Sequence, residues 1–237
     1  SEISEKSYFF RLSRYADRLK QHISENPDFV KPDFRKSEVL NFIAGGLTDM
    51  SITRQNCTWG VPSPTPEGFS IYVWFDALIN YLTGAEYQIP GGRFAEIWPP
   101  DIQLMAKDII RFHHILWPAM LMALGLQLPR TIFAHGFWIM GRDKMSKSKG
   151  NVVSPDGIIA EYGGSALRFF LLREVPFGLD GEYSEAAFRK RYNSDLANDY
   201  GNLVNRVLNL VEKKCGGVVP DAALDDGVAR LAGEVFQ

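Results

Sequence analysis

Short apolar runs of strand length alternate with helix-like segments through the middle of this chain. The runs cover residues 71–75, 102–106 and 131–134, and the first two continue directly into segments whose apolar residues have helical spacing. Successive parallel strands need a long crossover between them, and an α-helix is its usual form. The alternation therefore predicts an α/β fold built on a parallel sheet.

Helical spacing marks the segments around these runs. Residues 8–23 and 37–43 are expected to be helical or mixed. Residues 109–124 are apolar nearly all round, which indicates a buried helix. We expect this helix to kink or restart at Pro118, which lacks a backbone N–H, and to end at Gly125.

The last quarter of the chain has a different pattern. From residue 184 onward no strand-like run follows, and a helix is expected to end at Gly216 and Gly217. A three-four spacing there predicts one apolar helix face, made of Leu196, Tyr200, Leu203, Val207 and Leu210. We therefore expect the α/β part to give way to a helical part near residue 180.

Composition narrows the class of protein. The chain is 46% hydrophobic, yet no apolar run reaches the roughly 18 residues that span a bilayer, so we expect a globular protein and no membrane partner. Cys57 and Cys215 form no CxxC pair, which predicts neither a disulfide framework nor a metal site in these residues and favours the cytoplasm. The net charge of −2 argues against nonspecific coating of nucleic acid.

The most distinctive local feature is the run Lys-Met-Ser-Lys-Ser-Lys-Gly-Asn at residues 144–151. It gathers three ammonium groups and two hydroxyls just before a glycine. Lysine supplies a mobile point charge with three donors, and serine adds hydroxyl donors, which suits a triphosphate whose charge shifts during transfer. The alternative is a solvated surface loop.

Ligands of open α/β sheets bind beyond the carboxyl ends of the strands, so we consider the side chains at two such junctions. The first junction has Trp74 and Asp76, with Tyr81 further along the same segment. The second has Asp108, followed five residues later by His113. Together, indole, phenol, imidazole and carboxylate would hold a soft, polarizable side chain by sulfur–aromatic contact, with the carboxylate on an α-ammonium group.

A structural interpretation of the same residues stays open. Asp76 and Asp108 are placed where they could cap helix N-termini. Trp74 could belong to the core, and His113 could be a hydrogen-bonded core histidine. In either case we expect its neighbour His114 to face away.

Four segments carry a resemblance to a known family. They are YVWFDALINY, KDIIRFHHILWPAM, AHGFWIMGRDKMSKSKGNVVSP and NSDLANDYGNLVNRV. Together they resemble the methionyl-tRNA synthetases, class I aminoacyl-tRNA synthetases whose second signature is KMSKS, over nearly the whole chain. The resemblance implies the C-terminal half of a Rossmann-like nucleotide-binding domain followed by an all-α, helical-bundle anticodon-binding segment.

The resemblance also assigns roles to single residues. It implies a methionine side-chain pocket lined by Trp74, Ala77 and Tyr81, while Asp108 would bind the amino group of methionine and His113 would lie near the thioether or its aromatic wall. Leu78 stands where some family members have proline, a departure that concerns only the detail of this pocket.

Further roles concern ATP and tRNA. By resemblance, His135, Gly136 and Phe137 would border the adenosine, and the catalytic loop would act through Lys144, Ser146, Lys147 and Ser148, with Lys147 stabilising the transferring phosphates. Asn202 and Arg206 share a helix face and become candidate anticodon readers, against the alternative of a solvated polar face. The implied partners are methionine, ATP with Mg²⁺, and tRNA(Met).

The resemblance divides the chain into the end of a connecting insertion (1–48), the second half of the catalytic domain (49–141), the KMSKS loop with a linking segment (142–183) and the start of the anticodon domain (184–237). Both ends look cut, and the upstream HIGH signature is absent, so we expect a fragment that does not activate methionine alone. The resemblance confines any zinc site to the upstream part. The alternatives are a sister class I synthetase for leucine, isoleucine, valine or cysteine, or a noncatalytic RNA-binding module on the same scaffold.

Overall fold

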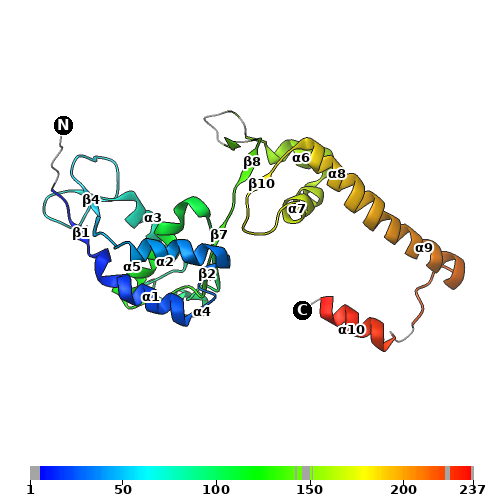
Figure 1. The fold of residues 1–237 in the computed structure, drawn as a ribbon, viewed down its shortest axis with the longest axis horizontal. Coiled ribbons are helices and arrows are strands. Elements are labelled where there is room, and N and C mark those ends of the chain that lie inside the picture. The colour runs from blue at the N-terminus through cyan, green and yellow to red at the C-terminus, as the bar shows by residue number, and fades with distance from the viewer. Residues whose placement is uncertain (1–5, 142, 146–149, 151, 222–224, 236–237) are drawn as a thin grey trace. The chain divides into compact units, whose positions relative to one another are not determined.

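The structure is a computed structural model that describes residues 6–141, 143–145, 150, 152–221 and 225–235. Contacts between residues divide the chain into two compact units (Figure 1). The first comprises Ser1–Lys144 and Val175–Glu182, and the second comprises Met145–Glu174 and Tyr183–Gln237. The short segment Val175–Glu182 therefore belongs to the first unit although both of its neighbours in sequence belong to the second.

A parallel sheet lies at the centre of the first unit. Its strands run in the order β2 (Val30–Lys31), β7 (Thr131–His135) and β6 (Ile102–Ala106). Both pairings are parallel, and β6 and β7 lie in register from Ile102 opposite Thr131 to Ala106 opposite His135. The predicted α/β fold and the strands expected at 102–106 and 131–134 are confirmed, with β7 one residue longer than expected.

The strand expected at residues 71–75 is wrong. Only Ser70–Ile71 (β5) is a strand, and it pairs antiparallel with β4 (Thr53–Arg54) outside the parallel sheet. Helix α3 (Val73–Gly84) begins two residues later. The cause is that the apolar run contributes to a helix whose Leu78 and Leu82 are buried in the core, a pattern that a five-residue window cannot separate from a strand.

The crossover from β6 to β7 is the expected buried helix, with an irregular first half. It consists of a 3₁₀ turn (η3, Lys107–Ile109), a π-helical stretch (η4, Phe112–Leu116) and α5 (Trp117–Leu124). Pro118 lies in the first turn of α5, so the predicted restart is confirmed, and the preceding turn widens where proline cannot donate its hydrogen bond. Gly125 ends the helix with a positive φ of 70°, as predicted.

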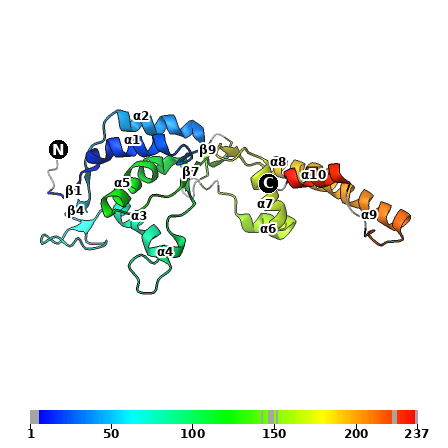
Figure 2. The same ribbon diagram turned by 90° about the horizontal axis from the view of Figure 1, so that it is seen from below.

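The core lies between this crossover and two helices near the N-terminus. The expected mixed segment 8–23 contains strand β1 (Phe9–Phe10), a 3₁₀ turn (η1, Leu12–Tyr15) and α1 (Ala16–Glu25), and the expected helix 37–43 is α2 (Lys36–Ala44). α1 and α2 lie side by side (Figure 1 and Figure 2). The buried side chains of these helices, the crossover and β7 include Leu19, Ile23, Val39, Ile43, Trp117, Leu121 and Ile132.

Shorter elements complete the first unit. β1 pairs antiparallel with β3 (Met50–Ser51), and α4 (Phe94–Ile97) precedes β6. A second small sheet has the order β10 (Gly181–Glu182), β8 (Trp138–Met140) and β9 (Asp143–Lys144), in which β10 runs parallel to β8. The segment Val175–Glu182 thereby lies against the chain that leaves β7.

The second unit is helical in its described part. Its helices are α6 (Pro155–Tyr162), α7 (Gly164–Arg173), α8 (Glu185–Arg191), the π-helical stretch η6 (Tyr192–Gly201), α9 (Asn202–Cys215) and α10 (Asp226–Val235). Phe170 and Phe188 form its buried centre. Arg191 ties α8 to α7 and η6 through ion pairs with Glu174, at 2.7 Å, and Asp195, at 3.2 Å.

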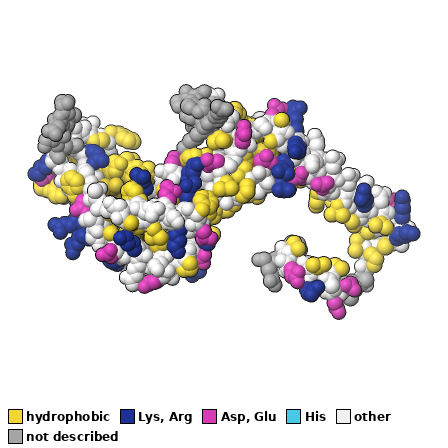
Figure 3. Space-filling view, in the orientation of Figure 1, with side chains coloured by type: hydrophobic (Ala, Val, Ile, Leu, Met, Phe, Trp, Pro, Cys, Tyr) yellow, Lys and Arg dark blue, Asp and Glu magenta, His cyan; other side chains and the backbone are white. Residues whose placement is uncertain are grey.

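The expected helix over the residues that follow 184 is confirmed, and it ends at Gly216 with a positive φ of 61°. Its apolar residues Leu203, Val207 and Leu210 are exposed in the described chain, and Figure 3 shows hydrophobic side chains on the surface along α9 and α10. Across the described ranges, no helix combines the length and apolar character needed to cross a membrane.

Candidate active site

Helix α3 presents three of the predicted pocket residues. Trp74, Ala77 and Tyr81 follow a three-four spacing and therefore lie on one face of the helix. Leu78 and Leu82 on the adjacent face are buried and anchor the helix in the core. The predicted cap at Asp76 is wrong, because the extended residue Tyr72 is the N-cap and Asp76 lies in the first turn.

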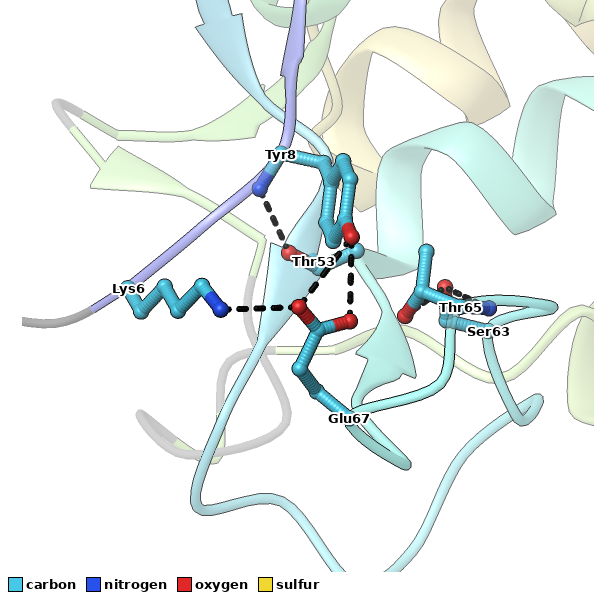
Figure 4. Close-up of polar contacts among 6 residues, drawn as sticks. All are labelled: Lys6, Tyr8, Thr53, Ser63, Thr65 and Glu67. Atoms are coloured by element: carbon cyan, nitrogen blue, oxygen red, sulfur yellow. Dashed lines mark hydrogen bonds and ion pairs between the residues drawn. The ribbon is translucent and has the colours of Figure 1, made fainter.

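A polar cluster around Glu67 fixes the hairpin that leads into α3 (Figure 4). The Glu67 carboxylate pairs with the Lys6 ammonium at 2.8 Å and accepts the Tyr8 hydroxyl at 3.0 and 3.2 Å. The backbone N–H of Tyr8 donates to the Thr53 hydroxyl at 3.0 Å. The hydrogen bond from Lys6 lowers the pKa of Glu67 to about 2, so the carboxylate is charged at neutral pH. These contacts join the N-terminal segment to β4 and to the loop that precedes β5.

His113 meets Tyr81 across the interior of the unit. The Tyr81 hydroxyl lies 2.9 Å from Nε2 of His113, and Nδ1 of His113 lies 3.2 Å from the carbonyl oxygen of Ile109. A carbonyl can only accept, so Nδ1 carries the proton of the neutral ring and Nε2 accepts the Tyr81 hydroxyl. The two contacts therefore define one tautomer of His113.

Burial keeps both groups neutral. His113 is only 3% exposed, and burial lowers the pKa of its imidazole, while burial raises the pKa of the Tyr81 hydroxyl. An imidazolium would be poorly solvated at this position. The site therefore offers a hydroxyl and a neutral imidazole rather than a charge to a bound side chain.

Aromatic rings form the rest of this wall. Trp74 stacks on Phe112 with centroids 3.9 Å apart and meets His113 edge to face at 6.4 Å. Tyr81 also contacts Trp117, whose centroid lies 5.6 Å away, and Trp117 Nε1 donates to the Gln103 side chain at 3.0 Å. Such a wall suits an apolar, polarizable ligand group.

His114 faces the opposite side of the crossover, as expected. It is fully buried, with Nε2 at 3.0 Å from the Ile132 carbonyl of β7 and Nδ1 at 3.3 Å from the Ile110 carbonyl. Burial lowers its pKa to about 4. The neutral ring can donate through only one nitrogen, and the shorter contact to Ile132 favours Nε2. His114 thus connects the crossover helix to the sheet.

Asp108 lies in the 3₁₀ turn after β6 and lines a cavity of about 690 Å³. The predicted cap at Asp108 is wrong, because Ala106 occupies the cap position. The cavity wall also contains Lys107, Arg111 and Phe112. Among the described residues that line it, Asp108 is the only member of the predicted methionine set. The structure therefore brings the aromatic residues together, and Asp108 lines a cavity whose wall includes Phe112 of this aromatic group.

The turn predicted to border adenosine follows β7. His135 is the last residue of the strand, and its Nδ1 donates to the Gly136 carbonyl at 2.8 Å. The Phe137 N–H donates to the Asp180 carboxylate at 2.8 Å. Since β6 and β7 are parallel neighbours, this turn and Asp108 lie at the same carboxyl edge of the sheet.

The remaining predicted residues are only partly described. Lys144 lies in β9 opposite Ile139, and its side chain is outside the described part of the chain. Ser146, Lys147 and Ser148 lie outside the described residues. Asn202 and Arg206 both lie on α9, one turn apart and exposed.

Sequence reasoning gave no role to three residues of the site. Phe112 stacks on Trp74, and its position beside His113 in an aromatic stretch was a usable signal. Lys107 pairs with Asp180 at 2.5 Å across 73 positions in sequence. No local pattern connects residues so far apart.

An α/β unit that has polar and charged side chains suited to ligand binding at the carboxyl edge of its parallel sheet is typical of nucleotide-binding enzymes. The family model described as "tRNA synthetases class I (M)" matches residues 1–208, so the chain belongs to this family. The resemblance to methionyl-tRNA synthetases is confirmed.

The relatives agree on this family. The chain is 50% identical over 219 residues to "Methionine--tRNA ligase" of Caldanaerobacter subterraneus subsp. tengcongensis and 51% identical over 218 residues to that of Mycobacterium leprae. Each alignment covers 92% of this chain but only 34% and 41% of the relative. The chain thus spans less than half of the length of these relatives.

Solved structures show the same fold. The Mycobacterium tuberculosis methionyl-tRNA synthetase in complex with methionyl-adenylate is 48% identical, with a TM-score of 0.87 over 98% of this chain and 46% of that chain. Its apo form is 45% identical with a TM-score of 0.84. The arrangement described above is therefore that of the class I synthetase fold.

Proposed function

We propose that this chain is part of a methionine–tRNA ligase, which activates methionine with ATP and transfers it to the 3′ end of tRNA(Met). The observation that carries the proposal is the neutral His113–Tyr81 pair within the Trp74–Phe112 wall. It occurs in a chain 48% identical to a synthetase whose structure holds methionyl-adenylate. The chemistry of that wall fits a thioether.

Methionine binding would use two groups of residues. Trp74, Ala77, Tyr81 and His113 would contact the side chain, because a neutral aromatic wall favours a polarizable sulfur over a charged group. Asp108, at the edge of the sheet, would take the α-ammonium. Leucine and isoleucine lack the sulfur and would lose the sulfur–aromatic contact with this wall.

Activation proceeds by displacement at phosphorus. The methionine carboxylate attacks the α-phosphorus of ATP, and pyrophosphate leaves with Mg²⁺. A ribose hydroxyl of the terminal tRNA adenosine then attacks the carbonyl carbon of the mixed anhydride, which forms the ester and releases AMP. Mg²⁺ enters as part of the MgATP substrate. Lys147, assisted by Lys144, Ser146 and Ser148, would stabilise the growing charge on pyrophosphate, while His135, Gly136 and Phe137 border the adenosine.

We assign RNA recognition to the helical part. Asn202 and Arg206 on one face of α9 can hydrogen-bond to unstacked bases, which supports an anticodon-binding role for residues 184–237. Residues 1–48 would end a connecting insertion, 49–141 form half of the catalytic domain, and 142–183 carry the KMSKS loop. The free cysteines Cys57 and Cys215 are consistent with a cytoplasmic enzyme.

Amino-acid-dependent ATP–pyrophosphate exchange tests the function. We expect exchange with methionine alone among the twenty amino acids in the full-length protein, and none with residues 1–237 by themselves. Exchange with another amino acid would contradict the pocket assignment. Absence of exchange with all twenty would favour a noncatalytic RNA-binding protein.

A further inference from the structure

One carboxylate, that of Asp180, connects three segments of the first unit that are distant in sequence. Its Oδ1 accepts the Phe137 N–H at 2.8 Å, and its Oδ2 pairs with the Lys107 ammonium at 2.5 Å. Lys107 directly follows β6, and Phe137 lies two residues after the end of β7. The carboxyl ends of two neighbouring strands are thus tied to the segment Val175–Glu182.

Close packing holds that segment against the turn. A Cβ atom at Gly136 would overlap the Leu179 carbonyl, so the two backbones approach as only glycine allows. Phe177 stacks on Phe133 of β7 with centroids 4.2 Å apart. The packing of this segment therefore holds the Asp180 carboxylate in a defined position.

The electrostatics of the cluster are balanced. The hydrogen bond from Lys107, followed by that from the Phe137 amide, holds the pKa of Asp180 below its ordinary value, so the carboxylate is charged at neutral pH. The Lys107 ammonium also lies 5.1 Å from the centroid of the Phe137 ring. A charged ligand at this edge would meet a turn and an ammonium that are already oriented.

We propose that Asp180 is a positioning residue for ATP, which holds the turn at residues 135–137 and the Lys107 side chain in the geometry that nucleotide binding requires. The inference rests on the proposed function, which assigns this turn to the adenosine. Asp180 acts through Phe137 and Lys107 and touches no reacting atom. The aromatic wall for methionine is held by other contacts, those of Tyr81 with His113 and of Trp74 with Phe112.

The first test is Asp180→Asn in the full-length protein. Asparagine can accept the Phe137 N–H, but its amide NH₂ then faces the Lys107 ammonium, donor against donor. We expect the KM for ATP to rise about fivefold or more and the KM for methionine to change by less than about twofold. An equal rise in both KM values would indicate general damage and overturn the proposal.

Asp101→Asn is the matched control. Asp101 precedes β6 at its other end and pairs with Arg130 at 2.9 Å, with both side chains mostly exposed. This substitution also neutralises a carboxylate in an ion pair beside the same strand. Both KM values should stay as in the wild type, because an exposed pair contributes little.

A double-mutant cycle tests the route through Lys107. Lys107→Met should raise the KM for ATP in the same direction, and the double variant with Asp180→Asn should be no worse than the more damaging single variant. Fully additive losses would show that the two residues do not act as a pair and would overturn the proposal.

Hydrogen exchange gives a readout independent of catalysis. The Phe137 amide should exchange about tenfold faster in Asp180→Ala than in the wild type or in Asp101→Asn, because its acceptor is lost. Unchanged protection of this amide would refute the positioning role. Methionine-dependent ATP–pyrophosphate exchange by the wild type tests the proposed function separately. Equilibrium ATP binding by the variants tests the role of Asp180 even if that function fails.

Discussion

Removal of one hydroxyl group, in Tyr81→Phe, tests the architecture of the proposed methionine pocket. The change deletes the donor that lies 2.9 Å from His113 Nε2 and leaves a buried acceptor, since His113 is 3% exposed. Loss of a hydrogen bond that leaves a buried partner unsatisfied costs about 1–3 kcal/mol. Tyr81 itself is only half-buried, so we expect the substitution to lower the free energy of unfolding by an amount in the lower half of this range.

The functional effect of Tyr81→Phe follows from the same contact. Without the hydroxyl, the imidazole loses one of its two anchors, and a loss of about 1.4 kcal/mol would raise the KM for methionine about tenfold. The KM for ATP should not change. Steady-state ATP–pyrophosphate exchange by the full-length protein measures the effect on KM, and urea unfolding measures the effect on stability.

The control for this experiment is Tyr87→Phe. Tyr87 is partly buried, packs against Phe94 with centroids 4.9 Å apart, and its hydroxyl has no hydrogen bond among the described residues. Nitrogen-15 shifts should also show His113 protonated on Nδ1 in the wild type. Equal effects of the two substitutions, or a proton on Nε2, would refute the reasoning.

Three further predictions concern other parts of the chain. Lys147→Ala should lower the rate of adenylate formation by about a hundredfold or more with little change in methionine binding, as measured by single-turnover kinetics; equal losses in both would remove its proposed role. Arg206→Ala should lose discrimination between anticodons in tRNA charging while pyrophosphate exchange persists. The pKa of His114 is about 4 in the folded chain and about 6.5 in an unfolded chain, so the unfolded state binds more protons as the pH falls. Urea unfolding should therefore show the free energy of unfolding decreasing between about pH 6.5 and 4, by roughly 3 kcal/mol from this group. His114→Gln should remove this part of the pH dependence.

Regular elements were predictable where a local pattern was unambiguous. The runs at 102–106 and 131–134 became β6 and β7 because each is bounded by polar or turn residues and is too short for a helix. The run at 71–75 was mispredicted because its aromatic and β-branched residues have high strand propensity. In the structure most of the run forms the first turn of α3, the helix that buries Leu78 and Leu82. The strand β2 has only two residues and exists through its pairing with β7.

The site shows the same division. Helical spacing alone placed Trp74, Ala77 and Tyr81 on one face, and the resemblance supplied their roles. Nothing in the spacing placed His113, 32 positions away from Tyr81, within 2.9 Å of its hydroxyl. That contact depends on the π-helical stretch after β6, which turns His113 toward α3 and His114 toward β7.

The sequence by itself determined the α/β class and the family, because these follow from local periodicity and short motifs. Only the tertiary structure decided that Asp108 lines a cavity together with Phe112 and that Asp180 contacts the ends of two strands. The physical reason is that side-chain period is encoded within one or two turns of chain, whereas contacts between distant segments depend on how whole elements pack against a shared core.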